Sequence, residues 1–128
     1  MTGKKVTIIL SAFGIFVIIA AISIAVPIYQ SGFWHGPDAK FGDQHLKTAV
    51  ALIELHKVRF NQYPKSLKEL KYFGDWDGIA IQSVRYAVNN EQDKYCVEVT
   101  RGWIGKPELD MPDEFWQGTG YEADLCRK

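Results

Sequence analysis

The sequence predicts an α+β protein, in which an N-terminal transmembrane helix precedes an amphipathic helix packed on a small antiparallel β-sheet closed by one disulfide. Three observations predict this fold class. No charged residue occurs from Val6 to Tyr29, apolar residues recur at helical spacing after Asp43, and two alternating runs follow, with Cys96 in the second and Cys126 near the C-terminus. With 128 residues, the chain has room for one small domain beside the apolar segment.

The apolar segment Val6–Tyr29 would form a helix about 36 Å long, enough to cross a hydrocarbon core of about 30 Å. We expect an uncleaved anchor, because the apolar region of a signal peptide is usually only about 7 to 15 residues long. A cleaved signal peptide stays open as the alternative, since a small-residue pattern ends at Ala25. Lys4 and Lys5 precede the segment, so the charge bias places the N-terminus in the cytoplasm.

Glycines and Pro37 mark the stretch after the apolar segment as a linker. We expect the membrane helix to stop near Pro27. The sequence therefore divides into a cytoplasmic tip and transmembrane helix at 1–29, a linker at 30–42 and an α+β domain at 43–128.

Asp43 is a good N-cap for the amphipathic helix, which must end before Pro64. Its apolar positions recur at spacings of three and four and include Leu46, Ala49, Val50, Ile53 and Phe60. The run from Ser66 to Glu69 fits a capping box and predicts a short second helix to about Tyr72. Aspartate and glycine at 73–78 predict a loop.

Two runs of alternating apolar residues, 84–88 and 95–99, are separated by a polar stretch and predict a β-hairpin. Cys96 is expected on the face opposite the apolar residues or at a strand edge. Prolines and glycines predict a long loop over 101–120, and a last strand is expected near Tyr121–Cys126.

The two cysteines, Cys96 and Cys126, allow only one intramolecular pairing. We predict that they form a disulfide, because both follow the segment that places them outside the cytoplasm. Closing a loop of about thirty residues should stabilise the fold by about 3 to 4 kcal/mol. Two free buried thiols are the alternative.

No catalytic site is predicted. Lys plus Arg and Asp plus Glu number 15 each, so no net field would attract nucleic acid. Hydrolase, protease and phosphate-loop motifs are absent. Of the three histidines, His45 and His56 would lie about 16 Å apart on one helix, too far to share a metal, and with His35 they are interpreted as surface or packing residues.

The long loop before the predicted last strand offers two weaker candidate sites. Its carboxylates are oxygen ligands of the kind that calcium prefers, with an ordinary solvated acidic loop as the alternative. These residues are Glu108, Asp110, Asp113 and Glu114. Its aromatic residues are candidates for contact with a partner protein, or else they cover the open face of the sheet. These are Trp103, Phe115 and Trp116.

The segment from Ala49 to Leu70, AVALIELHKVRFNQYPKSLKEL, places a Tyr-Pro turn and a serine-led turn directly after the helix. This order of elements resembles the type IV pilin-like proteins, particularly the major pseudopilin of type II secretion. The resemblance covers Asp43 to Val99. It implies a disulfide between the C-terminal segment and the sheet, a calcium site in a C-terminal loop, and a bacterial inner membrane with the domain in the periplasm.

The N-terminus departs from that family. A prepilin peptidase site has glutamate at the fifth position after its glycine, but IFVII follows Gly14. We therefore expect a non-catalytic pilin-like domain on an ordinary anchor, making protein contacts in the envelope, with a link to a secretion or pilus-type assembly. The alternatives are a cleaved, secreted binding module and, less favoured, a small envelope enzyme.

Overall fold

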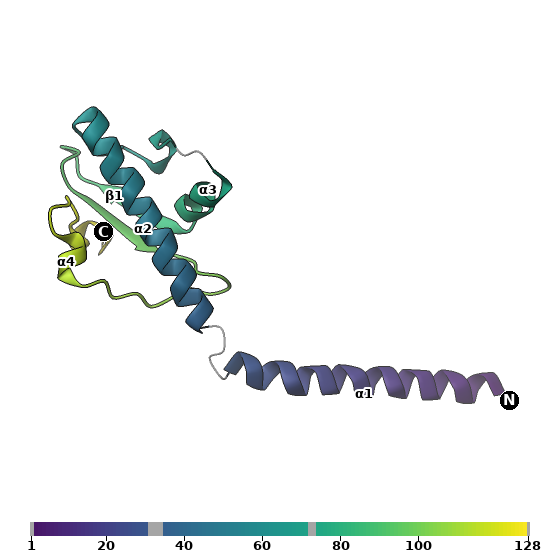
Figure 1. Cartoon of the computed structure of the whole chain (residues 1–128). Coiled ribbons are helices and arrows are strands. Elements are labelled where there is room, and N and C mark those ends of the chain that lie inside the picture. The colour runs from purple at the N-terminus through teal and green to yellow at the C-terminus, as the bar shows by residue number, and fades with distance from the viewer. Residues whose placement is uncertain (1, 31–34, 72–73, 128) are drawn as a thin grey trace. The chain divides into compact units, whose positions relative to one another are not determined.

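The computed structural model describes residues 2–30, 35–71 and 74–127 (Figure 1). It divides the chain into two compact units, unit 1 at 1–34 and unit 2 at 35–128. The predicted linker at 30–42 falls partly on residues 31–34, which lie outside the described residues. Tyr72, where the second helix was predicted to end, also lies outside them.

Unit 1 consists of the helix α1 (Thr2–Gln30), whose side chains are described from Gly14 to Ile28. The predicted stop near Pro27 is wrong, because the helix continues through this proline. A proline removes one helical hydrogen bond and its ring crowds the carbonyl four residues earlier, but only three residues of α1 follow Pro27.

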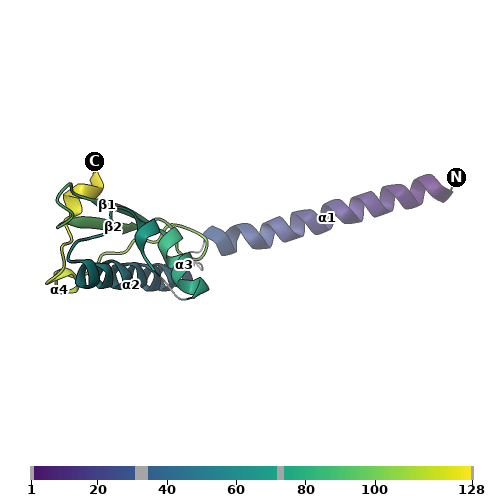
Figure 2. The ribbon, with the colours of Figure 1, turned by 90° about the horizontal axis from the view of Figure 1, so that it is seen from above.

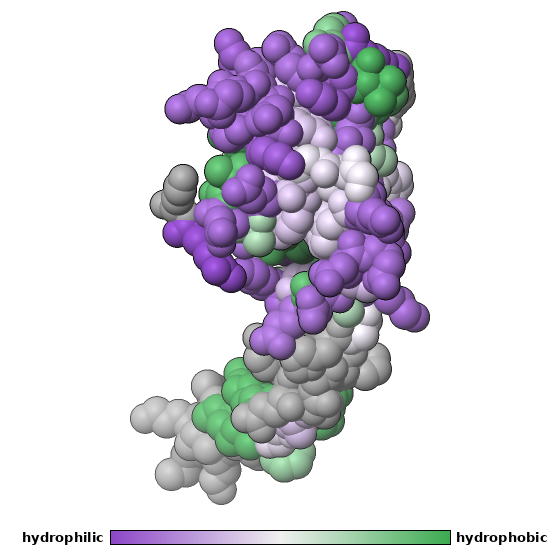
Figure 3. Space-filling view, turned by 90° about the vertical axis from the view of Figure 1, so that its left-hand side faces the viewer, coloured by the Kyte–Doolittle hydropathy of each residue, from purple (hydrophilic) through white to green (hydrophobic). Residues whose placement is uncertain are grey.

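Apart from Ser23, the described side chains of α1 are apolar, and all but Ala20 are exposed. The exposed large residues are Ile15, Phe16, Val17, Ile18, Ile19, Ile22, Ile24, Val26 and Ile28. Figure 3 shows green, hydrophobic residues in unit 1, whereas much of the visible surface of unit 2 is purple. Among the residues that the structure describes, no helix meets the length and hydropathy of a membrane span.

Unit 2 has the predicted α+β composition. Its elements are α2 (His35–Phe60), η1 (Leu67–Glu69), α3 (Asp75–Gln82), β1 (Val84–Val88), β2 (Tyr95–Val99), α4 (Asp113–Trp116) and η2 (Ala123–Arg127). The strands β1 and β2 form a two-stranded antiparallel sheet. In Figure 2, α2 lies on one side of this sheet and the C-terminal segment lies on the other.

The helix α2 begins at His35 rather than at the predicted Asp43. Pro37 falls in its first turn, where a backbone N–H would have no helical partner anyway, so the proline does not prevent the helix. Gly42 is buried inside the helix, and a Cβ at this position would collide with the ring of Pro107. The glycine that suggested a linker is therefore a packing position.

The predicted capping box is only partly right. Leu67–Glu69 forms one turn of 3₁₀-helix, and the Ser66 side chain makes no cap hydrogen bond. Glu69 does reach back, but its carboxylate accepts from the backbone N–H of Lys65 at 2.9 Å. The predicted loop at 73–78 is also wrong from Asp75 on, where α3 begins with two acidic residues in its first turn, a favourable placement at a helix N-terminus.

The predicted hairpin is confirmed. Its register pairs Val84 with Val99 and Val88 with Tyr95. On the face toward α2, the strands contribute Tyr95, Val97 and Val99 to a core that also contains Leu46, Ala49, Val50 and Ile53 of the helix. The alternating residues of β2 therefore define two faces, and the apolar one packs on α2.

The predicted disulfide between Cys96 and Cys126 is also confirmed, with 5.6 Å between the Cα atoms. Cys96 lies on the face of β2 opposite Tyr95 and Val97, and η2 covers it there, so β2 is buried on both faces. The predicted last strand at Tyr121–Cys126 is wrong. Only Tyr121 bridges to β2, at Tyr95, and the chain then turns into η2.

Candidate functional site

A groove with a volume of about 820 Å³ lies beside β2 in unit 2. It lies between β2, the first half of α2 and the segment 106–111, which we call the groove loop, and Trp116 of α4 and Tyr121 complete its lining. Its lining residues are Leu46, Val97, Glu98, Val99, Lys106, Pro107, Glu108, Leu109, Asp110, Met111, Trp116 and Tyr121. This volume lies within the range of ligand-binding clefts in proteins.

The groove combines an apolar floor with a charged rim. Leu46, Val97 and Val99 belong to the buried core and supply the floor. The charged lining residues are three carboxylates and one amine, namely Glu98, Glu108, Asp110 and Lys106. Because Glu98 is paired with Arg85, the rim's net charge comes from Glu108 and Asp110 against Lys106 and is negative, so the groove favours a partner that carries both apolar and basic groups.

The four acidic residues predicted to bind calcium lie in two places. Glu108 and Asp110 line the groove, whereas Asp113 and Glu114 lie in the first turn of α4 beside a shallower hollow. All four are exposed, and their carboxylates do not appear among the described groups of three or more ligand atoms within 4.8 Å of one another. The structure therefore does not bring them together as one ligand set.

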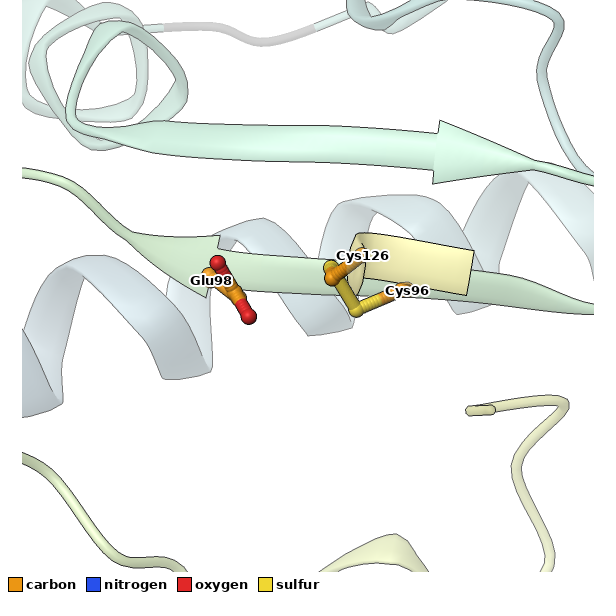
Figure 4. A group of neighbouring side chains, drawn as sticks. All are labelled: Cys96, Glu98 and Cys126. Atoms are coloured by element: carbon orange, nitrogen blue, oxygen red, sulfur yellow. A yellow bond between two sulfur atoms is a disulfide. The ribbon is translucent and has the colours of Figure 1, made fainter. Parts of the chain in front are cut away.

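One such group does occur, formed by Cys96, Glu98 and Cys126. Figure 4 shows the two sulfur atoms joined to each other, with Glu98 farther along the same strand. A metal binds the thiolate, and neither sulfur is a thiolate while the disulfide is intact. Glu98 instead pairs with the guanidinium of Arg85 at 2.6 Å. This cluster is a structural crosslink.

The three aromatic residues predicted to contact a partner are likewise divided. Trp116 lines the groove and stacks on Tyr121, with 3.7 Å between ring centroids and 15° between planes. Phe115 packs edge-on against Trp116. Both are half-buried and pack against the core. The exposed Trp103 lies elsewhere, against Phe41 of α2.

Trp103 belongs to a second, smaller hollow of about 190 Å³ near the start of α2. A buried carboxylate positions this part of the chain, because Asp38 accepts hydrogen bonds from the backbone N–H groups of Ile104 and Gly105. His45 is buried in the wall of the hollow, and its Nδ1 lies 3.3 Å from the carbonyl oxygen of Arg101. Its Nε2 has no partner among the described residues.

A tyrosine cluster surrounds Glu54 at the other end of β2. The hydroxyls of Tyr63 and Tyr95 donate to Oε1 of Glu54 at 3.1 and 2.9 Å. Burial, followed by the Glu54 charge, raises the pKa of Tyr63 to about 12, and the same two causes raise the pKa of Tyr95 further. Both tyrosines therefore keep their protons at neutral pH and act as donors inside the core.

Sequence reasoning missed the groove, although three of its candidate site residues, Glu108, Asp110 and Trp116, line it. The missing information was the path of the loop, which depends on Pro107 packing against Gly42 of α2. A glycine inside an amphipathic helix and a proline in a distant loop were the available signals, but nothing in the sequence paired them. Comparisons of this chain with protein-family models, curated proteins and solved structures find no match.

Proposed function

We propose that this chain is a non-catalytic, membrane-anchored, pilin-like protein of a bacterial envelope that holds a partner protein in the groove beside β2. The proposal extends to a link with a secretion or pilus-type assembly. The observation that carries it is the groove itself, with its apolar floor and three rim carboxylates. Its lining residues include no histidine, cysteine or serine, so no serine or cysteine nucleophile with a histidine base lines it.

The anchor is supported by the composition and exposure of unit 1. No charge occurs from Val6 to Tyr29, and the large side chains described in α1 are exposed around its whole circumference. A helix that is apolar on every side is typical of a membrane or of a large protein core. The disulfide supports an oxidising compartment such as the periplasm for unit 2.

A site-specific photo-crosslinking experiment tests the groove. A photoreactive phenylalanine analogue replaces Met111 in the full-length protein, which is expressed in native membranes and irradiated. Met111 lines the groove, so we expect a covalent adduct with a partner protein. The matched control replaces Val58, an exposed apolar residue in the last turns of α2 with 81% exposure. An absent adduct at 111, or the same adducts at both positions, would contradict the proposal.

Two measurements on the same preparation test the anchor. Intact mass determines whether the bond after Ala25 has been cut, and extraction with alkaline carbonate releases proteins that no transmembrane segment holds. We expect an uncleaved chain that stays in the membrane pellet. A chain that begins at Val26 would instead establish the secreted binding module.

A further inference from the structure

We propose that the groove holds its partner as an extended segment that adds a strand to the free edge of β2. The inference rests on the proposed function only in taking the groove as the contact site. It specifies what the partner presents there, which is its own backbone together with alternating apolar and basic side chains.

The hydrogen-bond pattern of the hairpin determines which residues of β2 face its free edge. Just outside the strands, the N–H of Asn89 donates to Lys94 and the N–H of Thr100 donates to Ser83. Antiparallel pairs alternate between bonded and non-bonded, so the bonds to β1 use Cys96 and Glu98. The backbone groups of the residues between them, Tyr95, Val97 and Val99, point away from β1.

Only the first of these outward residues is paired. Tyr95 donates to the carbonyl of Gly120 at 2.9 Å and accepts from the N–H of Glu122 at 2.7 Å. For the outward groups of Val97 and Val99, no hydrogen bond is found among the described residues, and both valines line the groove. Unpaired N–H and C=O groups along a strand edge are a template for another strand.

The chain itself begins a third strand here and does not complete it. Tyr121 forms a single parallel bridge with Tyr95. After Glu122 the chain enters η2, and Cys126 is bonded to Cys96 on the opposite face of the sheet. The disulfide therefore keeps the C-terminal segment away from Val97 and Val99, and the edge beside them is left for another chain.

The groove loop lines the groove together with this edge. Val97 is 2% exposed, so a partner strand reaches its backbone only when a neighbouring segment moves, and the proposal takes the groove loop as that segment. Among the described residues, no hydrogen bond involves the backbone of 106–111. Half-buried Leu109 and Met111 and the packing of Pro107 hold it in place. A loop held in this way moves when its apolar contacts break, and the partner's apolar side chains replace those contacts.

The side chains around the edge define the sequence of the partner. Residues of an added strand that share a face with Val97 and Val99 would contact the apolar floor, so they are aliphatic. Those between them share the face of Glu98 and lie near the rim carboxylates Glu108 and Asp110, so they are basic. The partner segment therefore alternates aliphatic residues with lysine or arginine, a typical peptide for strand addition.

The test uses a synthetic peptide of about seven alternating lysine and valine residues, extending about 23 Å. Amide hydrogen exchange is measured by NMR on the full-length protein in micelles. We expect the peptide to slow exchange at Val97 and Val99 and to leave the amide of Tyr95, which is already paired, unchanged. The proposal is overturned if this peptide, at about 1 mM, does not slow exchange at Val97 and Val99.

Two N-methylated isomers of the peptide provide the matched control, because they carry the same side chains but block opposite sets of backbone amides. Only one set faces β2, so we expect one isomer to lose about tenfold or more in affinity and the other to bind like the parent peptide. If N-methylation of the valine amides lowers the affinity, the added strand is antiparallel to β2. If N-methylation of the lysine amides lowers it, the added strand is parallel to β2. Equal binding of both isomers overturns backbone pairing.

The two proposals fail in different ways. If the photoreactive residue at 111 captures no partner, the groove is not the contact site and the proposed function fails. If a partner is captured but both isomers compete with it equally, the contact stands and strand addition is wrong. Replacing Glu98 and Asp110 together with lysine should weaken binding of the basic peptide about tenfold through lost charge attraction, without altering the effect of N-methylation.

Discussion

The two ends of β2 differ in how their free edge is completed. At the Tyr95 end, the backbone is paired with 120–122, and the hydroxyl donates to Glu54. Nearby, the Tyr63 hydroxyl also accepts from the N–H of Gly120 at 2.8 Å. At the Val99 end, the same edge faces a groove and a loop without hydrogen bonds to it among the described residues. Apolar packing covers both ends, but hydrogen bonds complete only one.

This contrast separates two physical roles within one strand. A buried hydrogen bond fixes geometry and makes local opening expensive, whereas apolar contacts tolerate sliding and replacement. The Tyr95 end therefore holds the fold together, and the Val99 end can exchange one covering segment for another.

Of the changes that test the Tyr95 end, removal of the disulfide should have the largest effect on stability. We expect Cys96→Ala with Cys126→Ala to lower the free energy of unfolding by about 3 to 4 kcal/mol, because the crosslink restrains a long loop of the unfolded chain. The two cysteines are 30 residues apart. Urea unfolding followed by near-ultraviolet circular dichroism measures the change. A loss below about 1 kcal/mol would show that the crosslink is not a main support of this end.

Alkaline pH should weaken the same end through Tyr63. Its pKa is about 10 in the unfolded chain and about 12 in the fold, so the unfolded state loses its proton first as pH rises. The contribution of Tyr63 to the free energy of unfolding is therefore fully present below pH 10 and is lost as pH rises from about 10 to about 12. Urea midpoints measured across this range, with tyrosinate absorbance recorded in parallel, check the window. A flat profile through pH 12 would contradict it.

A single hydroxyl should have a smaller effect. Tyr63→Phe removes a donor to Glu54 and leaves the buried N–H of Gly120 without its acceptor, so we expect a loss of about 2 kcal/mol in the free energy of unfolding. The matched control is Tyr121→Phe, because no hydrogen bond of that hydroxyl is found among the described residues. It should change stability by less than about 0.5 kcal/mol. Equal losses of unfolding free energy in both variants would show that the Tyr63 hydroxyl has no particular stabilising role.

The smallest effect on stability is expected at the groove loop. Leu109 is half-buried there, so Leu109→Ala should cost about 1 kcal/mol, less than the 2 to 5 kcal/mol typical of a fully buried residue such as Ile53. In the unmodified chain, amides of the loop should exchange with solvent much faster than the amide of Tyr95. Comparable exchange rates at the two places would erase the difference between the ends of β2.

Much of unit 2 was predictable from local sequence patterns. The amphipathic spacing after Asp43 gave a correct helix as far as Phe60, and the alternating runs gave both strands within their observed bounds. The disulfide followed from there being two cysteines and one pairing. These features depend on periodicity and counting, which do not require knowledge of distant contacts.

Other features depend on contacts between distant segments. Pro37 and Gly42 resemble linker residues locally, yet the first lies where a helix tolerates proline and the second makes room for Pro107. The segment after Tyr121 was predicted to be a strand, but it is crosslinked to Cys96 and forms η2. The groove depends on the packing of Pro107 at Gly42 and on the turn of the C-terminal segment into η2, so periodicity alone does not predict it.

Because of the disulfide, most of the residues that line the groove also belong to a covalent ring. The bond between Cys96 and Cys126 encloses Val97, Val99, the groove loop and α4 within one closed loop of chain. A protease that cuts the groove loop therefore opens the ring without releasing a fragment. The cut molecule migrates as one species until a reductant separates its pieces, so damage to this surface stays hidden in any assay that leaves the disulfide intact.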